Sequence, residues 1–210
     1  MPGGTKKRVS VYVDGFNLYH AIDDLRDDSL KWLCLRRLSE SIIRGDEELR
    51  AVKYFSAFAT WIPDAMLRHR AYVEALKCEG VKFIEGNFKK KFLKCKVCGA
   101  QYQTHEEKET DVNIAIHLIQ DTFHDTFDRA IVISADTDMA SAIAIARQLS
   151  GTKQIDVVCP PGRFARARSL KPLFELPRGK IKAARLDEKY VTSPGATVNV
   201  PTKYRLPVRT

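Results

Sequence analysis

The chain has 210 residues, of which 44% are hydrophobic and 29% charged, a composition typical of a globular domain with a buried core. No apolar run approaches the roughly 20 residues that cross a bilayer, and the basic start lacks the apolar stretch of a signal peptide, so we expect no membrane partner and no secretion. Five cysteines, an odd number, argue for the reducing cytoplasm, and a net charge of +9 favours a polyanion such as nucleic acid.

Short β-branched runs alternate with segments of helical periodicity along the chain. The first run, Arg8 to Val13, is followed by a turn at Asp14 and Gly15. The run Ala130 to Ser134 is apolar throughout, as in a strand buried on both faces. In chain order the predicted strands are 8–13, 51–59, 81–84, 130–134 and 154–159. The predicted helices are 17–25, 35–43, 63–80, one that begins at 110, 139–149 and a short one at 163–170.

This alternation predicts an α/β fold, because parallel strands joined by right-handed helical crossovers form one sheet with helices on both faces. We assign residues 8–186 to this domain. Residues 89–105 are basic, contain Cys95 and Cys98 and show no clear period, so we expect an inserted loop or small knuckle. Residues 187–210 form a basic C-terminal tail, either mobile or laid as a strap over the domain or a partner.

Aspartates occupy positions in this predicted sheet that suggest a site. Asp14 follows the first strand, and Asp136 and Asp138 follow the strand 130–134. Ligands of open parallel sheets bind where the carboxyl ends of the strands meet. Asp111 lies in the first turn of a predicted helix, where it could merely complement the helix dipole, worth about 0.3–1 kcal/mol. Any one of these acids alone would suit a turn or a cap, but clustered carboxylates repel each other, and Mg²⁺ or Mn²⁺ resolves that repulsion.

Other polar residues lie near these acids in sequence. Asn17, one helical turn after Asp14, could hold a water molecule or a phosphate oxygen, or could cap the helix. Ser134 could contribute a hydroxyl contact or serve the turn. Glu107 would share a face with Asp111 if that helix began early, and Glu109 is the competing acid nearby.

Three segments together resemble the NYN domain, a branch of the PIN-like nuclease superfamily, and in particular its LabA-like bacterial members. They are VYVDGFNLYHAI at 11–22, EKETDVNIAIHLI at 107–119 and AIVISADTDMASAI at 130–143. The resemblance implies a Rossmann-like three-layer sandwich with a mainly parallel sheet of five or six strands in the order 3-2-1-4-5. It also implies hydrolysis of RNA that depends on Mg²⁺ or Mn²⁺. By position, Asp14, Asp111 and Asp136 match the family's metal ligands, Asn17 matches a motif asparagine, and Asp138 matches an acid that acts through water.

The predicted function is therefore a metal-dependent endoribonuclease that leaves a 5′-phosphate. One departure is that Ala135 and Thr137 stand where many relatives have glycine around the first acid of the third segment. The alternative is a non-catalytic RNA-binding or regulatory protein that retains the fold. A phosphatase with a covalent aspartyl intermediate is disfavoured, because Asn17 rather than a second aspartate follows Gly15 and Phe16.

The pair Cys95 and Cys98 has the spacing of half a zinc site. Cys78 or His105 could add ligands, or a second chain could supply its own pair in a homodimer. The alternative is two reduced surface thiols. If zinc binds, it would stiffen the segment that leads to Asp111.

Basic residues near aromatic ones are typical of proteins that bind single-stranded RNA. Phe88, Phe92 and Tyr102 are interleaved with the lysines of the insertion. A second basic group follows the last predicted strand, at the same edge of the sheet as the acids. The candidate RNA-binding residues are Lys90, Lys91, Lys94, Arg163, Arg166 and Arg168. A solvated loop and a solvated helix face are the alternatives.

Overall fold

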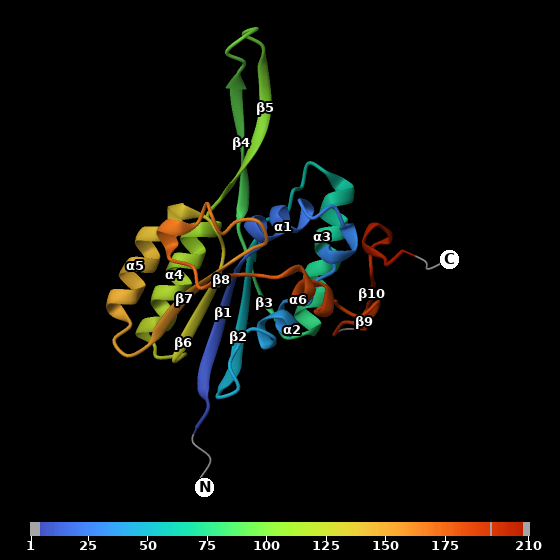
Figure 1. Cartoon of the computed structure of the whole chain (residues 1–210). Helices are drawn as coiled ribbons and strands as arrows, with labels where there is room; N and C mark the ends of the chain where they lie inside the picture. The colour runs from blue at the N-terminus through green and yellow to red at the C-terminus, as the bar shows by residue number, and fades with distance from the viewer. Residues whose placement is uncertain (1–4, 194, 208–210) are drawn as a thin grey trace.

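The computed structural model describes residues 5–193 and 195–207, and a six-stranded parallel sheet forms its centre (Figure 1). The sheet order is β3-β2-β1-β6-β7-β8. Counted in chain order within this sheet, the strands run 3-2-1-4-5-6, which confirms the predicted order and adds one edge strand. The strands are β1 (Lys7–Asp14), β2 (Glu47–Ser56), β3 (Lys82–Glu85), β6 (Arg129–Ile133), β7 (Gln154–Cys159) and β8 (Phe174–Glu175).

Helices cover both faces of this sheet, as predicted for an α/β fold (Figure 1). One face carries α1 (Gly15–Asp23), α2 (Leu35–Glu40), α3 (Pro63–Cys78) and α6 (Arg178–Ala183). The other face carries α4 (Thr110–Phe123) and α5 (Ala140–Leu149). The chain also forms the short 3₁₀ segments η1 (Asp28–Lys31), η2 (Thr137–Met139), η3 (Arg168–Leu170) and η4 (Thr202–Tyr204). The helix predicted over 163–170 is thus reduced to η3.

Alternating side chains of the central strands feed two separate core clusters. In β1, Val11 and Val13 belong to the cluster under α1, α2, α3 and α6, whereas Tyr12 belongs to the cluster under α4 and α5. In β6, Ile131 and Val132 divide in the same way. Successive side chains of a strand point to opposite faces, so a continuous apolar run satisfies both clusters.

Gly15 sets the sharp transition from β1 into α1. A Cβ at this position would lie 2.5 Å from the ring of Tyr54 and 2.7 Å from the carbonyl oxygen of Phe55. Only glycine fits this close to the neighbouring backbone. Because the turn can pack tightly there, Asp14 is held at the end of the sheet.

The insertion is an antiparallel β-hairpin, not the irregular loop that we predicted. Its strands are β4 (Asn87–Lys94) and β5 (Gln101–Lys108), and it projects away from the domain (Figure 1). Most side chains of both strands are exposed or half-exposed. With no buried face, the hairpin has no need for the alternation of apolar and polar residues by which strands are recognised in a sequence.

The C-terminal segment follows the strap alternative rather than the mobile one. It forms a small antiparallel pair, β9 (Lys189–Val191) and β10 (Thr197–Asn199), which lies against α3. Val200 and Tyr204 are buried in the core cluster under α1, α2, α3 and α6, and η4, which contains Tyr204, lies against η1. Residues 194 and 208–210 of the predicted tail lie outside the part of the chain that the structure describes.

Candidate metal centre

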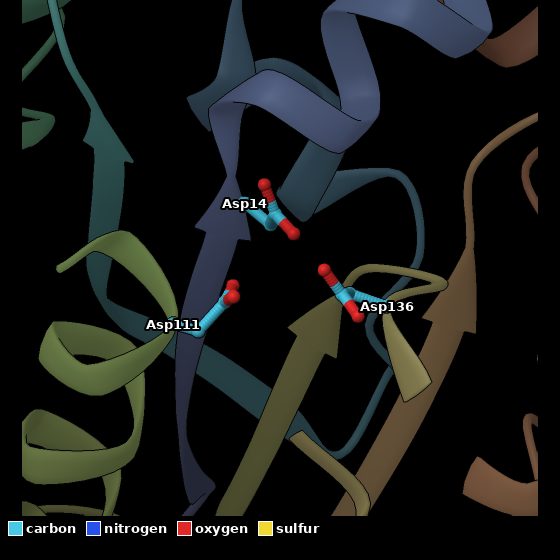
Figure 2. Close-up of side chains that lie close together, drawn as sticks. All are labelled: Asp14, Asp111 and Asp136. Atoms are coloured by element: carbon cyan, nitrogen blue, oxygen red, sulfur yellow. The ribbon is translucent and has the colours of Figure 1, made fainter. Parts of the chain in front are cut away.

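Asp14, Asp111 and Asp136 converge at the carboxyl ends of the central strands. Strands β1 and β6 are parallel neighbours, with Val13 opposite Ile133, so the residues that follow them meet at one edge of the sheet. Figure 2 shows the three carboxylates directed toward one another from β1, α4 and the segment after β6. One oxygen from each lies within 4.8 Å of the others.

Asp14 is held in place by contacts to both of its carboxylate oxygens. The backbone amide of Asn17 donates to Oδ1 at 3.0 Å, so Asp14 is the cap of α1. The hydroxyl of Ser134 donates to Oδ2 at 2.7 Å and accepts from the amide of Asp136 at 3.0 Å. Ser134 therefore couples the orientation of Asp14 to the segment that carries Asp136.

Asn17 joins the same arrangement through its side chain. Its Oδ1 accepts a hydrogen bond from the amide of Ala135 at 3.1 Å, which ties α1 to the end of β6. The amide nitrogen of Asn17 is the atom that can donate to a phosphate oxygen. The capping alternative is wrong for Asn17, because Asp14 takes that position.

Asp138 stands apart from the converging acids. It is exposed in η2, and its backbone amide donates to Oδ1 of Asp136 at 3.0 Å. The pKa of Asp111 is raised by burial, then by the negative charges of Asp136 and Asp138. This position fits an acid that acts through water more than a direct metal ligand.

Burial and mutual repulsion raise the pKa values of Asp14, Glu107 and Asp111. Burial is the main reason that the pKa of Asp14 rises to about 7, and the charges of Asp111 and Glu107 raise it further. Burial likewise raises the pKa of Glu107 to about 7 and the pKa of Asp111 above its ordinary value. Unfavourable negative charge of this kind is what a bound cation would neutralise.

Glu107 belongs to the site, but not for the reason that the sequence suggested. It lies in β5 rather than on an early turn of α4, and its Oε1 accepts from the hydroxyl of Thr110 at 2.6 Å. The chain turns sharply from β5 to α4 at Glu109, which has a left-handed φ of 75°. That uncommon conformation brings Glu107 and Asp111 into one cavity. The cavity has a volume of about 290 Å³ and is lined by Asp14, Phe16, Asn17, His105, Glu106, Glu107, Glu109, Thr110, Asp111 and Asp136.

An aromatic cavity of about 400 Å³ adjoins the acidic one and shares Phe16 and His105 with it. The ring of His105 stacks on Trp61 with centroids 3.6 Å apart, and Trp61 also meets the edge of Phe88. These aromatic residues come from α1, the segment before α3, and the hairpin. Sequence analysis did not find this cavity, because its residues are scattered along the chain without a common motif.

The cysteines and His105 do not form a zinc site within this chain. Cys95 and Cys98 lie at the tip of the hairpin, while His105 is stacked on Trp61 near its base. Cys78 lies at the end of α3, with its sulfur 3.9 Å from the carbonyl oxygen of Val191. Over residues 5–193 and 195–207, the aspartate trio is the one group of three or more His, Cys, Asp or Glu close enough to share a metal ion.

The predicted RNA-binding residues fall on two separate surfaces. Lys90, Lys91 and Lys94 lie along β4, where Lys91 pairs with Glu106 at 3.2 Å. Arg166 and Arg168 are exposed between β7 and β8, beside η2. Arg163 is tied to Asp24 by a salt bridge, so it is the weakest candidate for phosphate contact.

Comparison with known proteins places this arrangement in a family. The model of the NYN domain matches residues 8–171, most of the chain. This chain belongs to the NYN domain family. NYN domains are a nuclease-type family with nucleic-acid substrates, and the acidic trio lies within the matched residues. Membership of the PIN-like superfamily and of the LabA-like branch stays a prediction.

Two individual proteins are also similar to this NYN domain. The 6-hydroxy-3-succinoylpyridine 3-monooxygenase HspA of Pseudomonas putida is 27% identical over 188 residues, which cover 73% of this chain and 59% of that protein. A solved protein of unknown function from Vibrio parahaemolyticus has a TM-score of 0.54 and 19% identity, covering 84% of this chain and 95% of its own. At this identity the second likeness concerns the fold alone.

No helix of the NYN domain in the described residues is long and apolar enough to cross a membrane.

Proposed function

We propose that this protein is a metal-dependent endoribonuclease that cleaves single-stranded RNA. The observation that carries the proposal is the convergence of Asp14, Asp111 and Asp136 from three distant segments. The contacts that hold Asp14 come from an amide and a hydroxyl, and within the described chain no lysine or arginine is paired with any of the three. Folding has thus assembled negative charge without a protein cation to balance it.

The donor atoms fit a hard divalent ion. Carboxylate oxygens are the ligands of Mg²⁺ and Mn²⁺, and the trio offers one oxygen from each aspartate within 4.8 Å. Asp14, Asp111 and Asp136 would hold the ion. Once bound, it would supply Lewis acidity that lowers the pKa of water and neutralises charge on a phosphodiester.

Glu107 is the side chain best suited to move a proton at this site. Its pKa of about 7 means that it is present in both protonation forms near neutral pH. Its carboxyl lines the same cavity as the three aspartates, and Thr110 holds its Oε1. Its Oε2 could therefore accept a proton from an attacking water or return one to a leaving oxygen.

The surroundings of the acids favour an unpaired strand. Bases that are not paired can stack on aromatic side chains, at about 1–3 kcal/mol per base. Trp61 and Phe16 are 38% and 45% exposed where the aromatic cavity adjoins the acidic one, so a base beside the scissile phosphate could reach them. Arg166 and Arg168 at the same edge of the sheet would contact phosphates further along the strand.

The deciding experiment is cleavage of 5′-labelled single-stranded RNA with Mn²⁺ or Mg²⁺, with and without EDTA. We expect Asp14→Asn and Asp111→Asn to lower the rate about a thousandfold, the equivalent of about 4 kcal/mol of transition-state stabilisation. Asp64→Asn is the matched control, because Asp64 is an exposed carboxylate in the first turn of α3, the position that Asp111 has in α4. With RNA labelled at its 3′ end instead, a change in the mobility of the labelled product after phosphatase treatment would support the predicted 5′-phosphate.

Two outcomes would point elsewhere. RNA binding without metal-dependent cleavage, unaffected by Asp14→Asn, would favour a non-catalytic RNA-binding protein.

The name of the curated relative suggests a second candidate, hydroxylation of a pyridine ring, and the aromatic cavity is the observation that favours it. That reaction consumes dioxygen and a two-electron reductant. Oxygen uptake that depends on a hydroxypyridine, in a preparation that leaves RNA intact, would replace the proposal.

A further inference from the structure

The tip of the hairpin is shaped so that two thiols emerge together. The amide of Cys95 donates to the carbonyl of Ala100 at 2.8 Å, and the amide of Gly99 donates to the carbonyl of Cys95 at 3.0 Å. Gly99 has a left-handed φ of 72°, which glycine adopts at little cost. The amides of Val97 and Cys98 face the sulfur of Cys95, and the thiol of Cys98 also contacts it. Amides directed at a sulfur are a suitable environment for a thiolate ligand.

This turn supplies two ligands, whereas structural zinc takes four. His105 lies four residues along β5 from Gln101, roughly 14 Å from the start of that strand at about 3.4 Å per residue. Cys78 contacts Val191 at the far end of α3, and Cys34 and Cys159 are buried in the core. The described part of the chain therefore presents half of a zinc site.

We propose that two copies of this protein join at their hairpin tips around one zinc ion, with Cys95 and Cys98 of each chain as its four ligands. Two identical turns related by a two-fold axis supply a tetrahedral set of four sulfurs. The hairpin projects from the domain, so two tips can meet without contact between the domains (Figure 1).

Residues around the two cysteines suit such a junction. Val97 lies between them and is 95% exposed, so its side chain is available to contact its counterpart. Four thiolates around Zn²⁺ leave two negative charges, and Lys94 and Lys96 of each chain flank the site to balance them. Because β5 continues to Glu107, a fixed tip would also hold one wall of the acidic cavity. The zinc junction does not depend on RNA cleavage, so either can fail alone.

The test uses the full chain, purified with a reducing agent and without chelator. We expect a dimer by light scattering and native mass spectrometry, with one zinc ion per two chains by elemental analysis. Cys95→Ser and Cys98→Ser should each give a zinc-free monomer. Cys78→Ser is the matched control, since it removes another exposed thiol and should keep both zinc and dimer. Unchanged thermal melting of the two tip variants would show that the fold survives.

Four results would overturn the proposal. They are a zinc-free monomer of the unaltered chain, a monomer that holds one zinc ion per chain, a dimer that persists in Cys95→Ser, and a zinc-free dimer that reductant separates. Removal of zinc with a strong chelator should also dissociate the dimer, and zinc, but not magnesium, should restore it.

Discussion

Carboxylates are buried at both ends of the central sheet, but only one end supplies them with a cation. Near the amino ends of the strands, Glu47 and Asp156 both contact the guanidinium of Arg129, at 2.9 and 2.7 Å. All three side chains are almost completely buried. At the carboxyl ends, Asp14 is as deeply buried but has only an amide and a hydroxyl as partners.

The difference separates a structural charge cluster from a functional one. The burial of ions without a partner costs several kcal/mol each, and Arg129 offsets that cost within the fold. At the other end the cost remains, and the raised pKa of Asp14 expresses it. A site that keeps this cost is suited to a cation that arrives from solution.

The largest expected effect comes from removal of the cation at the structural end. Arg129→Met leaves Glu47 and Asp156 buried without a partner, so we expect the free energy of unfolding to fall by about 3–5 kcal/mol. Urea unfolding followed by circular dichroism measures this change.

Arg50→Met is the matched control for that substitution. Arg50 pairs with Glu48 on the surface, where both side chains are 54% exposed, so its loss should cost below about 1 kcal/mol. Addition of Glu47→Gln and Asp156→Asn to Arg129→Met should restore much of the stability. Equal, small effects of Arg129→Met and Arg50→Met would contradict the contrast between the two ends.

The same kind of change at the functional end should have the opposite sign. In metal-free protein at about pH 8, we expect Asp14→Asn to raise the free energy of unfolding by about 2–4 kcal/mol. The upper value follows from a pKa raised from 3.8 to about 7, roughly three units at about 1.36 kcal/mol each. Because the pKa is raised in the folded state, the penalty is absent below the unfolded pKa of about 4, grows as pH rises, and is complete above about 7.

Two controls isolate this effect from general changes in the turn. Asp138→Asn removes an exposed carboxylate next to the same site and should change stability by less than about 0.5 kcal/mol. Saturating Mn²⁺ should stabilise the unaltered protein and not Asp14→Asn. The difference between their free energies of unfolding should therefore become smaller. A destabilised Asp14→Asn at about pH 8 would show that the carboxylate serves the fold rather than a ligand.

Much of the fold and half of the site follow from sequence alone, for identifiable reasons. Strand β1 ends at Asp14, and Asp136 follows shortly after the end of β6, so parallel neighbours must place these acids at one edge. The turn at Gly15 and the start of α4 were also predictable, because local signals define them. These features give Asp14, Asp111 and Asp136.

The remaining features depend on tertiary contacts that leave no local signal. Glu107 enters the cavity because a hairpin without a buried face happens to end beside α4. Trp61 and His105 stack across segments that are far apart in sequence. Tyr204 is buried in the core although the sequence around it has no helical or strand periodicity.

The smallest of the expected effects concerns the competition between protons and metal for Asp14. A metal ligand must be deprotonated, and the pKa of Asp14 in metal-free protein is about 7. We therefore expect Mn²⁺ affinity, measured by calorimetry, to be nearly constant above about pH 7 and to fall about tenfold per pH unit below it, or about 1.4 kcal/mol. The pH at which the affinity begins to fall, the break, should be the same in Asp64→Asn, because that substitution leaves the site intact.

Glu107→Gln sharpens this prediction, because the charge of Glu107 is one cause of the raised pKa of Asp14. Loss of that negative charge lowers the pKa of Asp14, so the break in Mn²⁺ affinity should move to lower pH while its slope stays the same. Affinity that is independent of pH from about 5 to 8 would mean that Asp14 is already ionised in the metal-free protein. The two ends of the sheet would then differ in their partners but not in electrostatic cost, because an amide and a hydroxyl would stabilise a buried carboxylate as well as Arg129 does.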